Sequence, residues 1–181
     1  GAITLYMAEI FPNSKITAVS NSKSQGEFIL KKAESKGLKN IEIITANMET
    51  FETDKKFDRV ISIEMFEHMR NYQNLLKRIS NWLNSNGTLF VHIFVHKELT
   101  YKFDAVDNTD WMSKYFCSGG IMPSEKLLYS FQEDLSIAQY WKVQGTHYAK
   151  TARSWLQNMN KNKEKIMAIF NQHYPQGEAK K

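Results

Sequence analysis

The sequence FDRVISIEMFEHM, residues 57–69, joins a predicted strand directly to a group of acid–base side chains. Residues 57–63 contain an apolar, β-branched run that is typical of a buried strand. Two carboxylates and an imidazole follow at once, in Glu64, Glu67 and His68. Because ligands bind just beyond the carboxyl ends of the strands in open α/β sheets, these side chains indicate an active site.

On both sides of this stretch, apolar periodicity predicts short strands that alternate with helices. Strands are expected over residues 15–19, 41–45, 57–63 and 88–95, and helices over 2–11, 22–36 and 71–83. A turn is expected at Asn86-Gly87. Later in the chain we expect a short helix over 124–131, a strand over 137–143 and a long helix over 148–171. Alternation at this spacing is typical of parallel βαβ crossovers and predicts an α/β fold.

Composition narrows the class of protein. The 181 residues, 42% of them hydrophobic, suffice for a single domain, residues 1–181, with a sizeable core. The single cysteine, Cys117, favours a reducing compartment, so we expect a cytoplasmic protein. No apolar run approaches the roughly 20 residues that span a bilayer, and no signal-peptide pattern opens the sequence. The net charge of +5 could attract phosphate groups, but no nucleic-acid-binding motif accompanies it, and we expect a solvated helix face instead.

Residues 97–123 interrupt the alternating pattern with an irregular, aromatic-rich segment. It includes Trp111, Tyr115 and the pair Gly119-Gly120. Long loops inside a compact domain are usually functional or disordered. The aromatic content favours a lid that covers a substrate.

Polar or flexible residues recur at the positions where a nucleotide-type ligand would lie in such a fold. A glycine precedes the first helix, and polar side chains follow two strands, namely Gly1, Ser20, Asn21, Gln25, Asn47 and Met48. Glycine lets the backbone approach a ligand, Ser and Asn side chains could hydrogen-bond a ribose, and Asn47 could contact an adenine edge with Met48 packed on its face. Ser and Asn after a strand are also common turn formers, and the pattern alone leaves several cofactors open.

A set of motifs in this order resembles the cyclopropane-fatty-acid-synthase superfamily of S-adenosylmethionine-dependent methyltransferases. The motifs are Ser20-Asn21-Ser22-Lys23-Ser24-Gln25, Phe57-Asp58-Arg59, Glu64-Met65-Phe66-Glu67-His68, Leu75-Leu76, Phe90-Val91-His92 and His147-Tyr148-Ala149-Lys150-Thr151. Within the superfamily, the Glu-Met-Phe-Glu-His segment, Asp110-Trp111 and residues 119–124 resemble the coclaurine N-methyltransferase branch, which methylates amine nitrogens of benzylisoquinoline alkaloids. The resemblance extends from Gly1 to about Phe170.

This resemblance implies a Rossmann-like class I methyltransferase sheet with helices on both faces, and S-adenosyl-L-methionine as the cofactor. The ribose and methionine side of the cofactor would be held by Ser20, Asn21 and Gln25, and the adenine by Asn47 and Met48. Gly1 would be the last glycine of the family's glycine-rich loop.

The resemblance also implies catalytic roles. Glu64 would lie where cofactor and substrate meet, and Glu67 with His68 would position the amine and accept its proton. His92 and Tyr148 match positions that help Glu67 bind a bicarbonate base in the lipid-cyclopropanating relatives.

The predicted chemistry is coherent, because an amine attacks a sulfonium methyl group only with a free lone pair. A free alkyl amine is mostly protonated near neutral pH, and a positioned base contributes about 10²–10⁴-fold. His68 suits this role because its unperturbed pKa lies near physiological pH.

Simpler interpretations stay open. The Glu-rich segment could be a solvated helix start, His92 a core residue and Tyr148 a helix anchor. Metal binding is not expected, because His68, His92 and His96 lack a convincing ligand spacing. Lipid cyclopropanation or methylation is the alternative activity, and a non-catalytic methyltransferase-like module is the alternative class.

The sequence departs from the family at both ends. The strand that carries an acidic residue and the glycine-rich loop is absent before Gly1, and the final strand is absent at the other end. Because the first strand is central in the family's sheet, its neighbours would be left with unpaired backbone groups. We therefore expect a chain truncated at both ends; alternatively, the sheet closes up, or a partner chain or homo-oligomer supplies the strand.

Overall fold

The computed structural model describes residues 1–104, 111–115 and 119–174. The chain divides into two compact units, Gly1–Ile137 and Ala138–Lys181. The prediction of a single domain over residues 1–181 stays a prediction. Asp110 and Cys117 lie outside the described residues, as do parts of the predicted lid segment.

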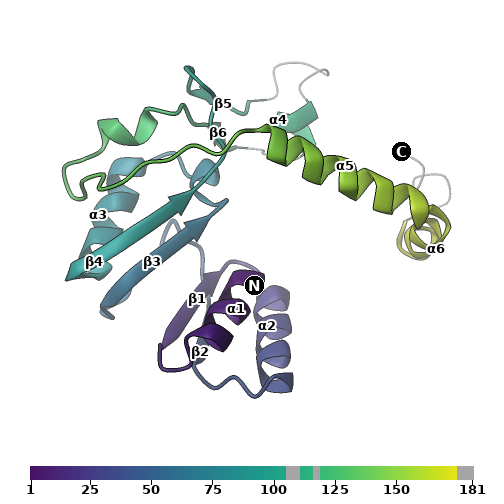
Figure 1. Cartoon of the computed structure of the whole chain (residues 1–181), viewed down its shortest axis with the longest axis horizontal. Coiled ribbons are helices and arrows are strands. Elements are labelled where there is room, and N and C mark those ends of the chain that lie inside the picture. Colours follow the sequence, from purple (N-terminus) through teal and green to yellow (C-terminus); the bar gives the residue numbers. More distant parts are fainter. Residues whose placement is uncertain (105–110, 116–118, 175–181) are drawn as a thin grey trace. The chain divides into compact units, whose positions relative to one another are not determined.

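The first unit alternates helices and strands as far as residue 92, except that two strands follow each other directly between residues 41 and 63 (Figure 1). These elements are α1 (Ala2–Ile10), β1 (Ile16–Ser20), α2 (Lys23–Ser35), β2 (Ile41–Thr45), β3 (Phe57–Ile63), η1 (Phe66–His68), α3 (Tyr72–Trp82) and β4 (Leu83–His92). Shorter elements follow, namely β5 (Tyr101–Lys102), α4 (Trp111–Tyr115), β6 (Ile121–Met122) and η2 (Leu127–Ser130). The second unit contains α5 (Thr146–Lys161) and α6 (Lys163–His173).

Two parallel strand pairs confirm the predicted crossovers. β1 pairs with β2 from Ile16↔Ile41 to Ser20↔Thr45, and α2 connects the two strands. β3 pairs with β4 up to Ile63↔His92 and is connected to it through α3. Within the described residues each pair forms a separate sheet, so β1 and β3 do not close onto each other. β5 and β6 form an antiparallel pair.

Local sequence sets the helix ends at the predicted places. α2 begins at Lys23 because Ser22 Oγ accepts the N–H of Gln25 at 3.4 Å. It ends just before Gly37, whose φ of 69° lies in the left-handed region where glycine is favoured. α3 begins after Asn71, whose side chain accepts the N–H of Asn74 at 3.0 Å. Side-chain capping therefore explains why these boundaries were readable from the sequence.

The expected turn at Asn86-Gly87 and the strand limits of 88–95 are wrong. β4 starts at Leu83, and the register between β3 and β4 shifts from Phe57↔Leu83 to Arg59↔Thr88. Residues 84–87 of β4 therefore lie opposite the single residue Asp58 of β3, so β4 has three extra residues here, and they form a bulge that stays within the strand. β4 ends at His92, because residues 93–95 make no ladder with β3.

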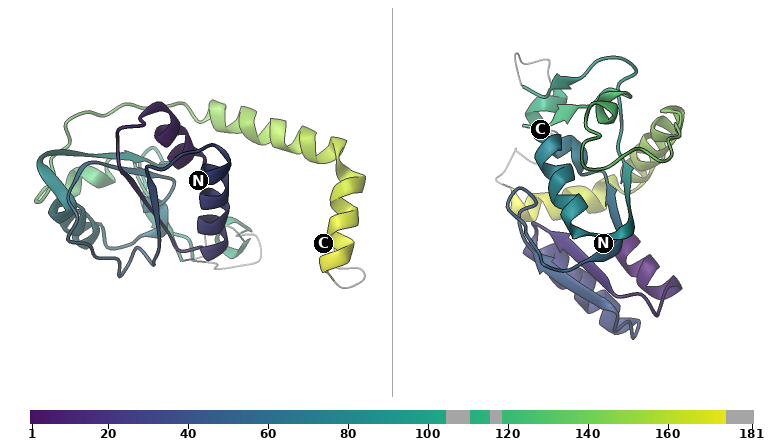
Figure 2. Two further views of the ribbon diagram at one scale, coloured as in Figure 1. Left: turned by 90° about the horizontal axis from the view of Figure 1, so that it is seen from below. Right: turned by 90° about the vertical axis from the view of Figure 1, so that its left-hand side faces the viewer.

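Two expectations for the second half of the chain are also wrong. Residues 137–143 form no strand, since no described strand pairs with them. The predicted helix over 148–171 begins at Thr146 and is divided at Asn162 into α5 and α6 (Figure 2). The Asn162 side chain donates to the Asn158 carbonyl at 2.8 Å, and such a bond competes with the helix ladder.

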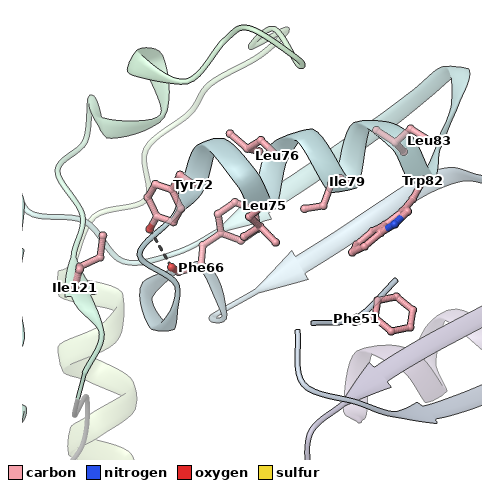
Figure 3. Packing of buried hydrophobic residues seen from close by; sticks show 9 residues of the cluster. All are labelled: Phe51, Phe66, Tyr72, Leu75, Leu76, Ile79, Trp82, Leu83 and Ile121. Carbon is pink, nitrogen blue, oxygen red and sulfur yellow. Dashed lines mark hydrogen bonds between the residues drawn. The ribbon is translucent and has the colours of Figure 1, made fainter. Parts of the chain in front are cut away.

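The main core of the first unit is the apolar face of α3 (Figure 3). Leu75, Leu76 and Ile79 are all buried on this face, as is Leu83 just after the helix. Phe51, Phe66, Tyr72, Trp82 and Ile121 complete this cluster. A smaller cluster of Leu5, Ile29 and Ala33 joins α1 to α2.

In the second unit, α5 and α6 have no buried residue. Trp155, Leu156 and Met159 are exposed on α5. Their spacing gives α5 an amphipathic character without a packed core of its own. No helix among the described residues combines the length and the apolar character that crossing a membrane requires.

Candidate active site

Glu64 occupies the turn directly after β3 and faces the end of β4. Its N–H donates to the His92 carbonyl at 2.9 Å, and its Oε1 lies 3.0 Å from Nδ1 of His92. Its φ of 51° lies in the left-handed region, which non-glycine residues rarely adopt. Backbone strain of this kind clusters at functional sites, so it supports a functional interpretation of Glu64.

Glu67 is a buried carboxylate on η1, with only 3% of the residue exposed. Burial raises the pKa of its side chain, and the nearby charge of Glu64 raises it further, against the opposing effects of a backbone hydrogen bond, His68 and His92. Its Oε2 has no hydrogen-bond partner among the described residues. A buried carboxyl group with a raised pKa can hold or accept a proton closer to neutral pH than an ordinary glutamate.

The 3₁₀ turn of η1 separates the predicted catalytic pair. Successive residues of a 3₁₀ helix point about 120° apart, which follows from its three residues per turn. Glu67 is therefore buried, whereas the next side chain, His68, is exposed. His68 is available to a molecule in solution, while Glu67 is shielded from water.

Tyr72 anchors η1 to α3, and the sequence analysis missed it. Its hydroxyl donates to the Phe66 carbonyl at 2.9 Å (Figure 3), and both side chains are almost fully buried. Burial raises the pKa of the Tyr72 hydroxyl, which keeps it in the protonated, donating form. Tyr72 lies in the first turn of α3, and its position on the same face as Leu75, Leu76 and Ile79 could have indicated an inward orientation.

The residues predicted for the ribose side meet at the end of β1. Ser20 Oγ donates to Gln25 Oε1 at 3.3 Å and accepts the N–H of Ser22 at 3.2 Å. Asn21 lies between them, directly before the N-terminus of α2. The first turn of a helix favours negatively polarised groups, so this corner can bind hydroxyl or carboxylate oxygens.

The predicted adenine residues follow β2 in a tight turn. The N–H of Ala46 donates to the Ser20 carbonyl at 3.0 Å, which ties this turn to the end of β1. The Asn47 carbonyl accepts the N–H groups of Thr50 and Phe51, at 3.1 and 2.9 Å. The Asn47 side chain is exposed, whereas Met48 is half-buried and packs against the main core.

The remaining predicted residues are Gly1 and Tyr148. Gly1 precedes α1, and a Cβ atom there would lie 2.3 Å from Cγ1 of Ile29. Close packing of Gly1 on α2 therefore explains the glycine without a ligand, and its cofactor role stays a prediction. Tyr148 belongs to α5 of the second unit, where its side chain is exposed, and its catalytic role also stays a prediction.

The described parts of the predicted lid segment converge beside η1. β5 pairs with β6, and the N–H of His96 donates to the Pro123 carbonyl at 2.8 Å. Arg70 Nε donates to the Gly119 carbonyl at 2.7 Å, and its Nη2 lies 3.2 Å from Asp104 Oδ1. The two arms of the segment are thereby fixed close to η1, which contains the predicted catalytic pair, an arrangement that was not predicted from the sequence.

A cleft of about 300 Å³ lies beside α3, bordered by His68, Arg70, Asn74, Arg78 and Gly119 among others. Of the predicted site residues, only His68 borders it. The cofactor residues predicted at the ends of β1 and β2 therefore do not line this cleft. Nowhere in residues 1–104, 111–115 and 119–174 do three or more His, Cys, Asp or Glu side chains form a group that could hold a metal ion.

Comparison with known proteins relates this arrangement to a family. The family model described as mycolic acid cyclopropane synthetase matches residues 1–176. The chain is 38% identical to (S)-coclaurine N-methyltransferase from Thalictrum flavum subsp. glaucum over 172 residues, which are 94% of this chain and 48% of that enzyme. The crystal structure of coclaurine N-methyltransferase bound to N-methylheliamine and SAH has a TM-score of 0.89 and 36% identity, covering 96% of this chain and 53% of the other.

A more distant structure shares the fold alone. The cyclopropane synthase MmaA2 from Mycobacterium tuberculosis has a TM-score of 0.70 and 19% identity, covering 84% of this chain and 57% of the other. These likenesses confirm the predicted fold class, a Rossmann-like class I methyltransferase fold. The chain spans about half the length of the curated relatives it matches, 48% in the case of the Thalictrum enzyme.

Proposed function

Because the chain belongs to the mycolic acid cyclopropane synthetase family, we propose that it takes part in the S-adenosyl-L-methionine-dependent N-methylation of a small amine. The observation that carries this proposal is the burial of Glu67, whose raised pKa suits its side chain to proton transfer. Glu67 lies three residues after Glu64, which is paired with His92. The 38% identity to a coclaurine N-methyltransferase supports an alkaloid-like amine as the acceptor.

The polar groups at the ends of β1 and β2 suit the proposed cofactor. The Ser20–Gln25 corner offers hydroxyl and amide groups for a ribose, and the exposed Asn47 amide can pair with an adenine edge beside Met48. Asn21 and Gly1 would contribute to the methionine side. S-adenosyl-L-methionine, when bound, supplies an electrophilic methyl group on a sulfonium centre.

The protein's own part in the reaction is to bind the amine and to remove its proton. The Glu64 and Glu67 carboxylates attract the ammonium form of the substrate, and Glu67 or His68 accepts the proton that frees the lone pair. The ion pair between Glu64 and His92 fixes the orientation of both side chains. A catalytic role for Tyr148 remains part of the proposal, on the resemblance alone. Alignment of the amine supplies much of the remaining rate enhancement.

An unsaturated lipid chain is the alternative acceptor, as in the cyclopropane synthases of this family. The sequence identity favours an amine, since it is 38% to the Thalictrum enzyme against 19% to MmaA2. A non-catalytic binding module is the alternative from another class.

The separate β1–β2 and β3–β4 sheets support a further strand between them. We propose that a strand from a longer form of the protein, or from a partner such as a second copy, pairs with β1 and β3. The use of a single cysteine supports the cytoplasm as the proposed location.

The experiment that tests this function is a calorimetric titration with S-adenosylhomocysteine, followed by transfer of a labelled methyl group. The chain and a longer form that carries the family's glycine-rich loop are compared, with coclaurine and with unsaturated phospholipid vesicles as acceptors. We expect S-adenosylhomocysteine to bind, and we expect methylation of coclaurine but not of the phospholipid. Glu67→Gln should be inactive, and the exposed Glu34→Gln should be as active as the wild type. Methylation of the lipid alone would favour the alternative activity, and no binding by either form would contradict the enzyme function.

A further inference from the structure

We propose that Arg78 is a positioning residue that holds the turn over residues 47–51 in place for the adenine part of the cofactor. This inference rests on the proposed function and adds a residue that neither the motifs nor the predicted site contain. Arg78 lies on α3, far from the turn in the sequence, so only the folded structure brings the two together.

The Arg78 guanidinium is bonded to the backbone of the turn. Its Nη1 donates to the carbonyls of Met48 and Glu49, at 3.0 and 2.9 Å. Its Nε lies 2.7 Å from Oε1 of Glu52, and only 13% of the Arg78 side chain is exposed. Hydrogen bonds from a charged donor are stronger than neutral ones, and those shielded from water lose less to competition with solvent.

Aromatic packing completes the attachment. The Arg78 guanidinium carbon lies 5.4 Å from the ring centroid of Trp82, one turn further along α3. The Trp82 ring in turn packs edge-on against Phe51, with 5.3 Å between centroids and an angle of 68°. Phe51 closes the turn, because its N–H donates to the Asn47 carbonyl. α3 therefore holds the turn at two points. The Arg78 guanidinium binds the carbonyls of residues 48 and 49, and the Trp82 ring packs on Phe51.

Besides these contacts, Met48 packs against the main core, and the remaining hydrogen bonds of the turn are local. Ala46, just before the turn, is bonded to β1, and the hydrogen bonds of Asn47 within the described part of the chain all reach residues 49–51 of the turn itself. Loss of the Arg78 bonds would leave the Met48 and Glu49 carbonyls to water and free the backbone to shift. Because recognition of a planar base requires well-placed groups, a shift of about 1 Å lowers affinity markedly.

A purely structural role is the competing interpretation, and a double-mutant cycle separates the two. If Arg78 positions Met48 for the adenine, the effects of Arg78→Lys and Met48→Ala on cofactor affinity are coupled. If Arg78 only stabilises the fold, the two effects add. Lysine keeps the charge and the aliphatic stem but lacks the planar fork, which makes Arg78→Lys the informative substitution.

The test measures the turn and the ligand separately, using the chain as it exists and the longer form described above. Hydrogen exchange at the Thr50 and Phe51 amides reports on the turn, and the Kd of S-adenosylhomocysteine reports on the site. Lys77→Gln, an exposed neighbour on α3, is the matched control, and Glu52→Gln is a milder variant should Arg78→Lys fold poorly.

For Arg78→Lys we expect exchange at Thr50 and Phe51 to rise about tenfold, while exchange in β4 is unchanged, and the Kd to rise about tenfold. The Met48→Ala effect should shrink in the Arg78→Lys background. Wild-type exchange and affinity in Arg78→Lys, or additive effects in the cycle, would overturn the inference. If the wild-type protein binds no S-adenosylhomocysteine, the proposed function fails together with the cofactor part of the inference, whereas the exchange result still decides whether Arg78 holds the turn.

Discussion

His92 and Glu64 face each other across the ends of two parallel strands and are joined twice. The backbone N–H of Glu64 donates to the His92 carbonyl at 2.9 Å, and the two side chains approach to 3.0 Å. The backbone bond continues the β3–β4 ladder by one residue, just where Glu64 turns into the left-handed region. The sheet thus determines where this carboxylate lies, and the strained turn determines which way the chain leaves it.

Replacing Glu64 should separate stability from activity. Glu64→Gly removes a left-handed strain of about 1 kcal/mol and an ion pair of similar or smaller worth, so we expect little change in the free energy of unfolding. Arg59→Gly, at an exposed position of β3 next to the bulge, should lower it by about 0.5–1 kcal/mol. Methyl transfer should fall at least tenfold in Glu64→Gly alone. Equal destabilisation of both variants in urea titrations would show that the turn is unstrained.

The raised pKa of Glu67 predicts a specific dependence of stability on pH. The native state holds the Glu67 proton more tightly than the unfolded state, where the pKa is ordinary, near 4.5. As pH rises from this value through the native pKa, the native state therefore loses stability, and the loss is complete above that pKa. Glu67→Gln should have a higher Tm than the wild type at pH 8, and the difference should vanish below about pH 4.

Glu42 provides a control of opposite sign for this pH series. A hydrogen bond from Lys55, followed by one from Thr17, lowers the pKa of the Glu42 carboxyl group. Its contribution is present above the unfolded pKa and lost as the pH falls. Glu42→Gln should therefore have a slightly lower Tm than the wild type at pH 8, whereas Glu67→Gln should have a higher one. A Glu67→Gln advantage that persists at low pH would contradict the role of the buried charge.

The fold was predictable where a local signal defined it. The strands over 41–45 and 57–63 and the α2 boundaries at Ser22 and Gly37 follow from apolar runs and capping residues. The strand expected over 137–143 failed because an apolar run becomes a strand only beside a partner, and none of the described strands pairs with it. The single helix predicted over 148–171 is divided at Asn162, because the Asn162 side chain competes for a helix carbonyl.

The site was only partly predictable for the same physical reason. Glu64, Glu67 and His68 are contiguous with a strand, so their place at its end could be derived from the sequence. The burial of Glu67 depends on the 3₁₀ turn, and Tyr72 and Arg78 act through the carbonyls of Phe66 and Met48. Periodicity contains no information about which distant carbonyl a side chain will reach.

Tyr72 should affect catalysis through the position of η1. Tyr72→Phe removes the hydrogen bond from the Tyr72 hydroxyl to the Phe66 carbonyl. This carbonyl still accepts the N–H of Met69 at 3.0 Å, so we expect a loss of only about 1 kcal/mol in the free energy of unfolding. The kcat should fall severalfold because Glu67 is less firmly placed, with the Kd of S-adenosylhomocysteine unchanged. The exposed Tyr6→Phe is the control. A change in Kd without a change in kcat would contradict this assignment.

Arg70 should affect the amine and spare the cofactor, the reverse of Arg78. It joins Gly119 and Asp104 in the predicted lid segment to the end of η1. Because the pair with Asp104 is exposed, Arg70→Lys should change the free energy of unfolding by less than about 1 kcal/mol. We expect the KM for the amine to rise several-fold, since the segment is less firmly held, and Asp104→Asn should produce part of the same effect. Lys102→Gln, exposed on β5, should leave the KM for the amine and the KM for S-adenosyl-L-methionine unchanged. A rise in the KM for S-adenosyl-L-methionine in Arg70→Lys would instead place this segment at the cofactor.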